Sequence, residues 1–221
     1  MQTGEGTIEI IYGSTSIPAG PQTLSGYLAR PDGEGEWPTV LLFGPDPLPS
    51  SSVKHISRMF ARHGIAALAP DVTEGHDTNS RITSRVAAFI SDPNGHWSNA
   101  QFGYGVLAFG GGIYDAAALA ADDGRVVAVS SVGATLDDAV AEHLSYANIA
   151  MLWIGSRGDA ATDVEASLEQ RESLPQTTFV VHADVGGGFW DDGAEGFDED
   201  TASDTIDRLV AFFGSELPPR V

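Results

Sequence analysis

The sequence contains no cysteine among its 221 residues. Disulfide bridges, a thiolate nucleophile and metal sites built on sulfur are therefore excluded. No apolar run approaches the roughly 20 residues that cross a bilayer. The N-terminus, Met1-Gln2-Thr3-Gly4-Glu5, lacks the basic and then apolar order of a secretory signal. These absences lead us to expect a cytoplasmic protein.

Positive charge is also scarce. Lys54 is the only lysine, and the chain has 11 Lys and Arg residues in total against 31 Asp and Glu residues. The formal net charge of −20 disfavours nucleic acid and anionic membranes as partners. The acidic bias suits either a high-salt habitat or a GC-rich coding bias, and composition does not separate the two. In both cases the charge predicts that added salt stabilises the fold.

What the chain does contain suits one globular domain. Hydrophobic residues make up 42% of the sequence, and we find no internal repeat, low-complexity tract or long linker. We therefore expect a single domain over residues 1–221 with a core of ordinary size.

Two kinds of hydrophobic pattern divide the chain. Residues 7–12 and 22–30 alternate around the turn signal Pro18-Ala19-Gly20-Pro21, which predicts an antiparallel hairpin. Solid apolar runs follow, and such runs are typical of strands buried on both faces of a parallel sheet. These runs are Thr39–Phe43, Ile65–Ala69, Gly105–Phe109, Val126–Ser130, Ile149–Ile154 and Thr178–His182.

Helix-length segments separate the runs. They are Val53–His63, Ser80–Ser91, Gly111–Ala121, Leu136–His143, Asp163–Leu174 and Thr201–Leu217, and Gly64 is placed to end the first of them. The alternation predicts a doubly wound α/β fold with a mostly parallel sheet, antiparallel N-terminal edge strands and helices on both faces. Functional residues of such folds gather at the carboxyl ends of the strands.

One of these strand ends has the outline of a nucleophile elbow, a sharp turn from a strand into a helix. Gly110-Gly111-Gly112 lies between the predicted strand Gly105–Phe109 and the predicted helix. We place the turning residue at Ala108, and a methyl group cannot attack a carbonyl. A phosphate cradle is disfavoured, because the glycines lack the G-x-G-x-x-G order and no lysine follows. Tight packing of helix on sheet is the ordinary explanation of such glycines.

Five segments occur in a characteristic order along the chain. They are Gly26–Pro31, Ala61–Asp71, Phe109–Gly111, Ile154–Asp159 and Gly188-Phe189. In their order and spacing they resemble the dienelactone hydrolase family of the α/β-hydrolase fold, over most of the chain. The resemblance implies that fold and the hydrolysis of carboxylic esters or lactones.

The same resemblance implies a triad of nucleophile, acid and histidine. Its positions fall on Ala108, Asp159 and Gly187, so only the acid is retained. The loop that would stabilise the oxyanion reads Pro45-Asp46, in which Pro45 has no N–H and the Asp46 carboxylate opposes a negative charge. Since nucleophile and base work together, hydrolysis by the family mechanism is not expected.

A relocated pair could replace them. His182 ends the last predicted strand and Ser156 lies in the neighbouring loop, so Ser156 and His182 are the alternative nucleophile and base. Ser156 lacks an elbow and is more simply explained as a turn hydroxyl. Asp159 is explained without catalysis as a turn residue that caps the backbone or pairs with Arg157.

The acidic stretch from Asp184 to Asp207 raises a calcium hypothesis, but its spacing matches no known calcium loop. Acids at the start of the last helix explain it better, and we expect neither a metal nor a cofactor. The remaining pocket should be apolar, with Phe109, Gly110, Phe189 and Trp190 around the oxyanion loop.

The sequence therefore favours a non-catalytic protein of this fold, a small-molecule-binding or assembly subunit. The alternative is a weak or unconventional ester or lactone hydrolase with a relocated nucleophile and base. A small apolar ligand or a protein is the expected partner, and the oligomeric state stays open.

Overall fold

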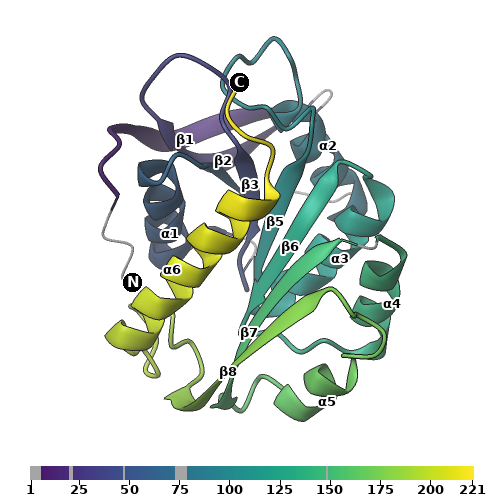
Figure 1. The fold of residues 1–221 in the computed structure, drawn as a ribbon. Coiled ribbons are helices and arrows are strands. Elements are labelled where there is room, and N and C mark those ends of the chain that lie inside the picture. The colour runs from purple at the N-terminus through teal and green to yellow at the C-terminus, as the bar shows by residue number, and fades with distance from the viewer. Residues whose placement is uncertain (1–5, 20–21, 47, 73–78, 148) are drawn as a thin grey trace.

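The computed structural model describes residues 6–19, 22–46, 48–72, 79–147 and 149–221. An eight-stranded sheet with the order β1-β2-β4-β3-β5-β6-β7-β8 crosses the molecule (Figure 1). Its strands are β1 (Ile10–Ala19), β2 (Gln22–Pro31), β3 (Thr39–Phe43), β4 (Ala66–Pro70), β5 (Tyr104–Phe109), β6 (Val126–Val132), β7 (Ala150–Gly158) and β8 (Thr177–Gly186).

The predicted pairing pattern is confirmed. β1 pairs antiparallel with β2 and β2 antiparallel with β4, whereas all pairs from β4 to β8 are parallel. β1 runs on to Ala19, beyond the predicted end at Tyr12, because its backbone pairs with β2 in unbroken register. Residues 20–21 of the predicted turn lie outside the described residues.

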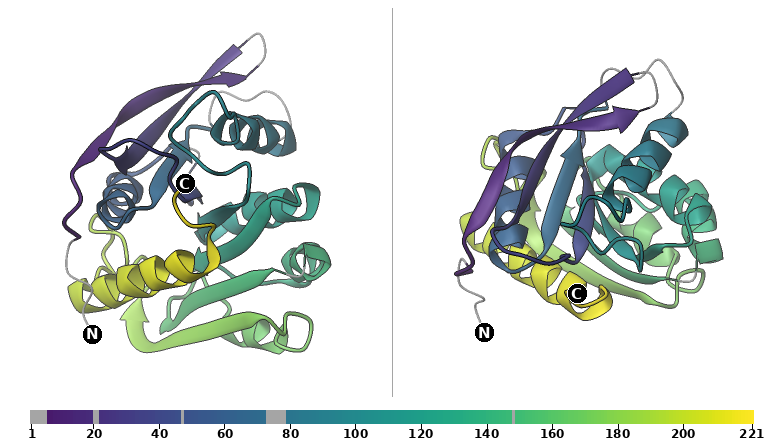
Figure 2. Two further views of the ribbon diagram at one scale, coloured as in Figure 1. Left: turned by 45° about the horizontal axis from the view of Figure 1, so that its top comes forward. Right: turned by 90° about the horizontal axis from the view of Figure 1, so that it is seen from above.

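Helices cover both faces of the sheet, as the alternation predicted (Figure 2). On one face, α1 (Ser51–Arg62) and α6 (Glu199–Glu216) pack over a core that includes Phe60 and Phe213, whose rings meet edge to face at 5.7 Å. On the other, α2 (Asn79–Ile90), α3 (Ile113–Asp122), α4 (Asp138–Ala147) and α5 (Val164–Glu169) share a second core. The solid apolar runs are thereby explained, since β3, β4 and β5 are buried along their whole length.

Local signals set the helix ends. The Ser50 hydroxyl accepts a hydrogen bond from the Val53 N–H and begins α1. Gly64, with a φ of +85°, takes the left-handed conformation expected beyond the last turn. The α4 helix begins two residues later than predicted, because the Leu136 N–H bonds the Ser167 hydroxyl and Asp137 caps the Val140 N–H. The α5 helix is shorter than predicted and ends at Glu169.

The parallel pairing brings the carboxyl ends of β3, β5, β6, β7 and β8 to one edge of the sheet. The loops that leave these strands carry most of the predicted site positions, and the others, Ala108, Phe109, Ser156 and His182, lie within β5, β7 and β8. None of the helices in the described residues has the length and apolar character needed to cross a membrane.

Candidate functional site

The elbow after β5 turns at Gly110, and the assignment of the turn to Ala108 is wrong. Ala108 is fully buried inside β5 and pairs with Phe43 of β3 and Ser131 of β6. Phe109 is still extended, and Gly110 has a φ of +50°. The sheet partners hold residues 108 and 109 in the strand, so the chain can turn only at the next residue. The residue at the turn therefore carries a hydrogen atom in place of a side chain.

The three glycines of the elbow differ in why a glycine is needed, and only two of them require one. Gly110 supplies the left-handed backbone of the turn. Gly112 allows close packing, because a Cβ there would lie 2.6 Å from the carbonyl oxygen of Phe43. Gly111 is exposed, and a Cβ on it would meet nothing within 4 Å. The packing explanation of the glycines thus holds for Gly112, while Gly110 marks the elbow itself.

Asp159, at the retained acid position, lies just beyond β7 and is only 7% exposed. Its carboxylate accepts hydrogen bonds from the Ala161 N–H at 2.9 Å and from the Thr162 hydroxyl at 2.7 Å. The expected backbone cap is confirmed. The expected pairing with Arg157 is wrong, because the Arg157 guanidinium pairs with Glu165 on the exposed side of the loop.

Gly187, at the histidine position, faces this carboxylate directly. A Cβ on Gly187 would lie 2.6 Å from Asp159 Oδ1. Gly133, at the end of β6, also faces the carboxylate, since its Cβ would lie 3.6 Å from Asp159 Oδ2. Acid and histidine positions are therefore adjacent in space, although they are 28 positions apart in the chain.

Pro45 lies against the elbow, as expected for the oxyanion loop. A Cβ on Gly110 would approach the Pro45 Cβ to 3.3 Å. Pro45 has no N–H, so it cannot donate to an oxygen held at this turn. The next residue, Asp46, is exposed and brings a carboxylate to the same loop.

The aromatic residues form a wall beside the acid. Trp190 is 8% exposed and stacks on Phe109, with ring centroids 4.1 Å apart. Its indole Nε1 lies 3.6 Å from the point that a Gly133 Cβ would occupy. Phe189 is fully buried and meets the His182 ring edge to face at 5.4 Å. Phe189 is therefore a core residue, whereas Trp190 borders the space between elbow and acid.

The alternative pair of Ser156 and His182 is not assembled. The two residues pair across β7 and β8, and both are described, yet no hydrogen bond joins their side chains. The Ser156 hydroxyl instead donates to the Val185 carbonyl at 2.5 Å and accepts from the Gly158 N–H. Burial lowers the pKa of His182, with opposing charge from Asp204, and its Nε2 has no hydrogen-bond partner. Ser156 is thus a backbone-bonded hydroxyl, as its simpler explanation proposed.

The acidic stretch before and within α6 serves local structure. Asp198 caps the helix through the Thr201 N–H, and Glu199 and Asp200 follow in its first turn. Asp191 and Asp192 both place a carboxylate oxygen against the Ser52 hydroxyl of α1, at 2.5 and 2.7 Å. Within the described part of the chain, no three His, Asp or Glu side chains are grouped to hold a metal ion.

A cavity of about 250 Å³ opens beside the elbow. Its walls come from the loop after β3, the end of β4 and the start of α3, and they include Pro45, Asp46, Pro70, Gly111 and Asp115. Of the predicted pocket residues, Pro45 and Asp46 line this cavity, whereas Phe109, Gly110, Phe189 and Trp190 do not. The cavity carries two acids and is less apolar than expected. Asp115 and Pro70 are the residues that sequence reasoning missed.

The misplaced elbow had a signal in the sequence. Residues 108–112 read Ala-Phe-Gly-Gly-Gly, which fits the elbow order G-x-nucleophile-x-G with Ala108 in place of the first glycine. Counting back two residues from Gly112, which cannot carry a Cβ, gives Gly110. Glycine-rich runs hide this register, because several glycines compete for each position.

Comparisons with known proteins identify the fold. No protein-family model and no curated protein sequence matches the chain. Among solved structures, a dienelactone hydrolase from Anabaena variabilis shares 18% identity and a TM-score of 0.73, over 95% of this chain and 99% of that one. An esterase domain from Rhodothermus marinus gives 15% and 0.74, over 93% and 99%. A dienelactone hydrolase-like promiscuous phosphotriesterase from metagenomic libraries gives 16% and 0.74, over 95% and 99%. The chain therefore has the α/β-hydrolase fold.

Proposed function

We propose that this chain is a non-catalytic protein of the α/β-hydrolase fold that binds a small molecule beside its elbow. The observation that carries the proposal is the pair of glycines at the reacting positions. Gly110 stands where a hydrolase carries its nucleophile, and Gly187 stands where the base would contact Asp159. Without a nucleophile and a base, the retained carboxylate has no proton relay to orient.

The oxyanion side supports the same conclusion. An acyl-transfer site needs N–H donors aimed at the developing negative charge. Pro45 removes a donor from the loop that faces Gly110, and Asp46 adds a negative charge to that loop. Binding survives such losses, because a cavity of about 250 Å³ remains at the carboxyl ends of β3 and β4. We place this role in the cytoplasm.

The test is a hydrolysis assay on short-chain aryl esters and simple lactones. The unmodified protein is compared with a heat-killed sample, with Gly110→Ser/Gly187→His, and with the matched control Gly110→Ala/Gly187→His. The control carries the same backbone strain and the same histidine but no nucleophilic hydroxyl. Assays at low and high salt separate inactivity from charge-driven unfolding.

We expect the unmodified protein and the alanine control to be inert. Activity in the serine variant alone would mean that only the reacting side chains are missing. Turnover by the unmodified protein above the heat-killed sample would refute the proposal. Both double variants must accommodate Pro45, whose Cβ lies 3.3 Å from the new Cβ at position 110, and the Asp159 carboxylate, which lies 2.6 Å from the new Cβ at position 187. The folding of both is therefore checked by thermal melting.

A further inference from the structure

The cavity beside the elbow has a distinct charge. Of its described lining residues, Asp46 and Asp115 are acidic and none is basic. Asp46 lies on the loop after β3, and Asp115 lies in the first turn of α3. Asp115 also takes part in another interaction, so Asp46 is the main counter-charge of the two. The only lysine, Lys54, is absent from the lining and has its ammonium 5.9 Å from the centre of the Tyr27 ring.

The side chains that line the cavity between these acids carry no hydrogen-bond donor. Pro45, Pro49 and Pro70 contribute rings without an N–H group, and Val72 adds an aliphatic side chain. Gly44, Gly111 and Gly112 add backbone polar groups to the lining. The charged side chains in the described lining are both negative, and they favour a cation over an anion. The volume of about 250 Å³ exceeds what a single coordinated metal ion needs, and the described acids are not grouped as metal ligands.

We propose that this cavity binds a small organic cation, an ammonium compound whose charge lies against Asp46 and Asp115. The inference rests on the proposed function, since it names the ligand class of the same cavity. The carboxylates would supply the charge, while the proline and valine walls would cover the methyl or methylene groups next to the nitrogen. The ligand thus differs from the apolar one that the sequence suggested.

The experiment uses three probes of similar small size on the full chain. Choline carries the positive charge, 3,3-dimethyl-1-butanol has the same shape without it, and acetate carries the opposite charge. Calorimetry measures affinity, and the amide signals of Gly111 and Gly112 in NMR spectra report whether a probe enters this cavity. We expect choline to bind and the uncharged isostere to bind at least about tenfold more weakly.

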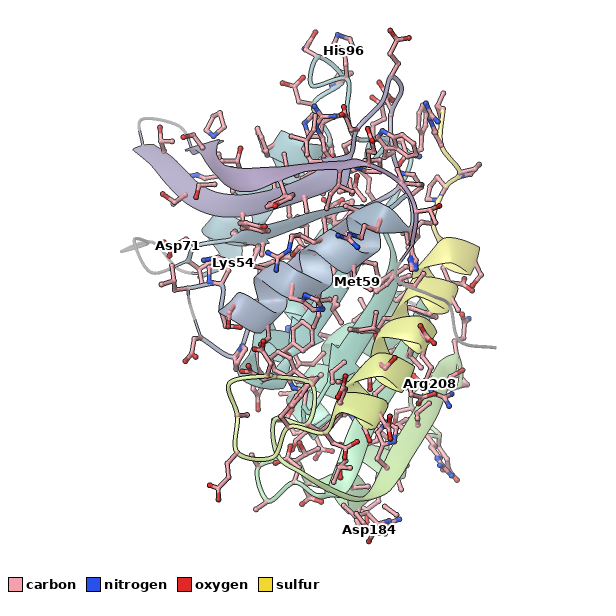
Figure 3. All side chains as sticks on the ribbon, turned by 90° about the vertical axis from the view of Figure 1, so that its left-hand side faces the viewer. Lys54, Met59, Asp71, His96, Asp184 and Arg208 are labelled. Carbon is pink, nitrogen blue, oxygen red and sulfur yellow. The ribbon has the colours of Figure 1, made fainter. Side chains whose placement is uncertain are left out.

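Matched variants separate a local site from the general field of a chain with a net charge of −20. Asp46→Asn and Asp115→Asn each remove one cavity charge, whereas Asp184→Asn removes one charge elsewhere. In Figure 3, Asp184 lies at the bottom of the molecule, well away from Asp71 at its left-hand side, the residue between the lining residues Pro70 and Val72. We expect a loss of at least about tenfold in choline affinity for Asp46→Asn, a smaller loss for Asp115→Asn, and no more than about twofold for Asp184→Asn.

Each other outcome overturns the inference in a recognisable way. Equal losses in Asp46→Asn and Asp184→Asn would show that choline follows the net charge alone. Equal binding of the isostere, or binding of acetate, would show that the cavity is not selective for cations, although a small-molecule role would stand. Silence of the Gly111 and Gly112 amides towards all three probes would refute the cavity as a ligand site. Ester turnover by the unmodified protein would refute only the non-catalytic role.

Discussion

The contact between Gly187 and Asp159 leads to a quantitative prediction for Gly187→Ala. The new Cβ would lie 2.6 Å from Asp159 Oδ1, closer than such atoms approach, so the carboxylate must move. That same oxygen accepts the Ala161 N–H, and the neighbouring oxygen accepts the Thr162 hydroxyl. A lost hydrogen bond to a charged group costs about 1.5–3 kcal/mol. The glycine has no left-handed φ, so the backbone itself accepts alanine.

One term opposes this loss. Replacing glycine by alanine restricts the unfolded chain and stabilises the fold by about 0.4–1 kcal/mol. The net expectation for Gly187→Ala is therefore a loss of about 0.5–2.6 kcal/mol in the free energy of unfolding. In a chain of 221 residues this corresponds to a fall of roughly 1–10 °C in Tm.

Gly214→Ala is the matched control. Gly214 is exposed in α6, and a Cβ there would meet nothing within 4 Å. Alanine in a helix should stabilise the protein by about 0.5–1 kcal/mol. Thermal and urea unfolding give the stability of both variants. Asp159→Ala and the double variant Asp159→Ala/Gly187→Ala then complete a double-mutant cycle with Gly187→Ala. The reasoning is refuted if Gly187→Ala is as stable as Gly214→Ala, or if removing Asp159 leaves the cost of Gly187→Ala unchanged.

Three further predictions follow from charge, capping and titration. Raising NaCl from about 0.01 M to about 1 M shortens the Debye length from about 30 Å to about 3 Å and should therefore raise Tm. A flat or falling Tm would contradict the expectation that the net charge of −20 destabilises the fold. Ser50→Ala should lower the free energy of unfolding by about 1 kcal/mol through loss of the α1 cap, whereas the adjacent Ser51→Ala should not, and equal effects would count against the cap. Burial lowers the pKa of His182 in the folded state; the charge of Arg208 lowers it further, whereas Asp204 and Asp198 oppose the shift. The unfolded chain therefore binds a proton at His182 more readily than the folded chain does. The free energy of unfolding should therefore fall as the pH drops below about 6.5, and it should fall less steeply in His182→Gln. Urea titrations at several pH values measure both proteins, and parallel pH profiles of the two would exclude His182 from the acid response.

The sequence by itself determined much of the architecture. Solid apolar runs located six strands. Five of them are mostly buried, because a strand covered on both faces cannot alternate with polar residues, whereas the edge strand β8 is only partly buried. Gly64 marked the end of α1 for a reason internal to the residue, its access to a positive φ. The absence of any histidine between His182 and Val221 was also readable from the sequence.

Only the tertiary structure decided the register of the site. Phe43 and Val132 on neighbouring strands hold Ala108 and Phe109 extended, and this moves the elbow to Gly110. Three contacts around the site join residues that are 28 or more positions apart in the chain. They are the hydrogen bond from Ser156 to Val185, the contact of Gly187 with Asp159 and the approach of Pro45 to Gly110. Local periodicity specifies which residues are buried, but it carries no information on which distant backbone or side chain fills the space beside them.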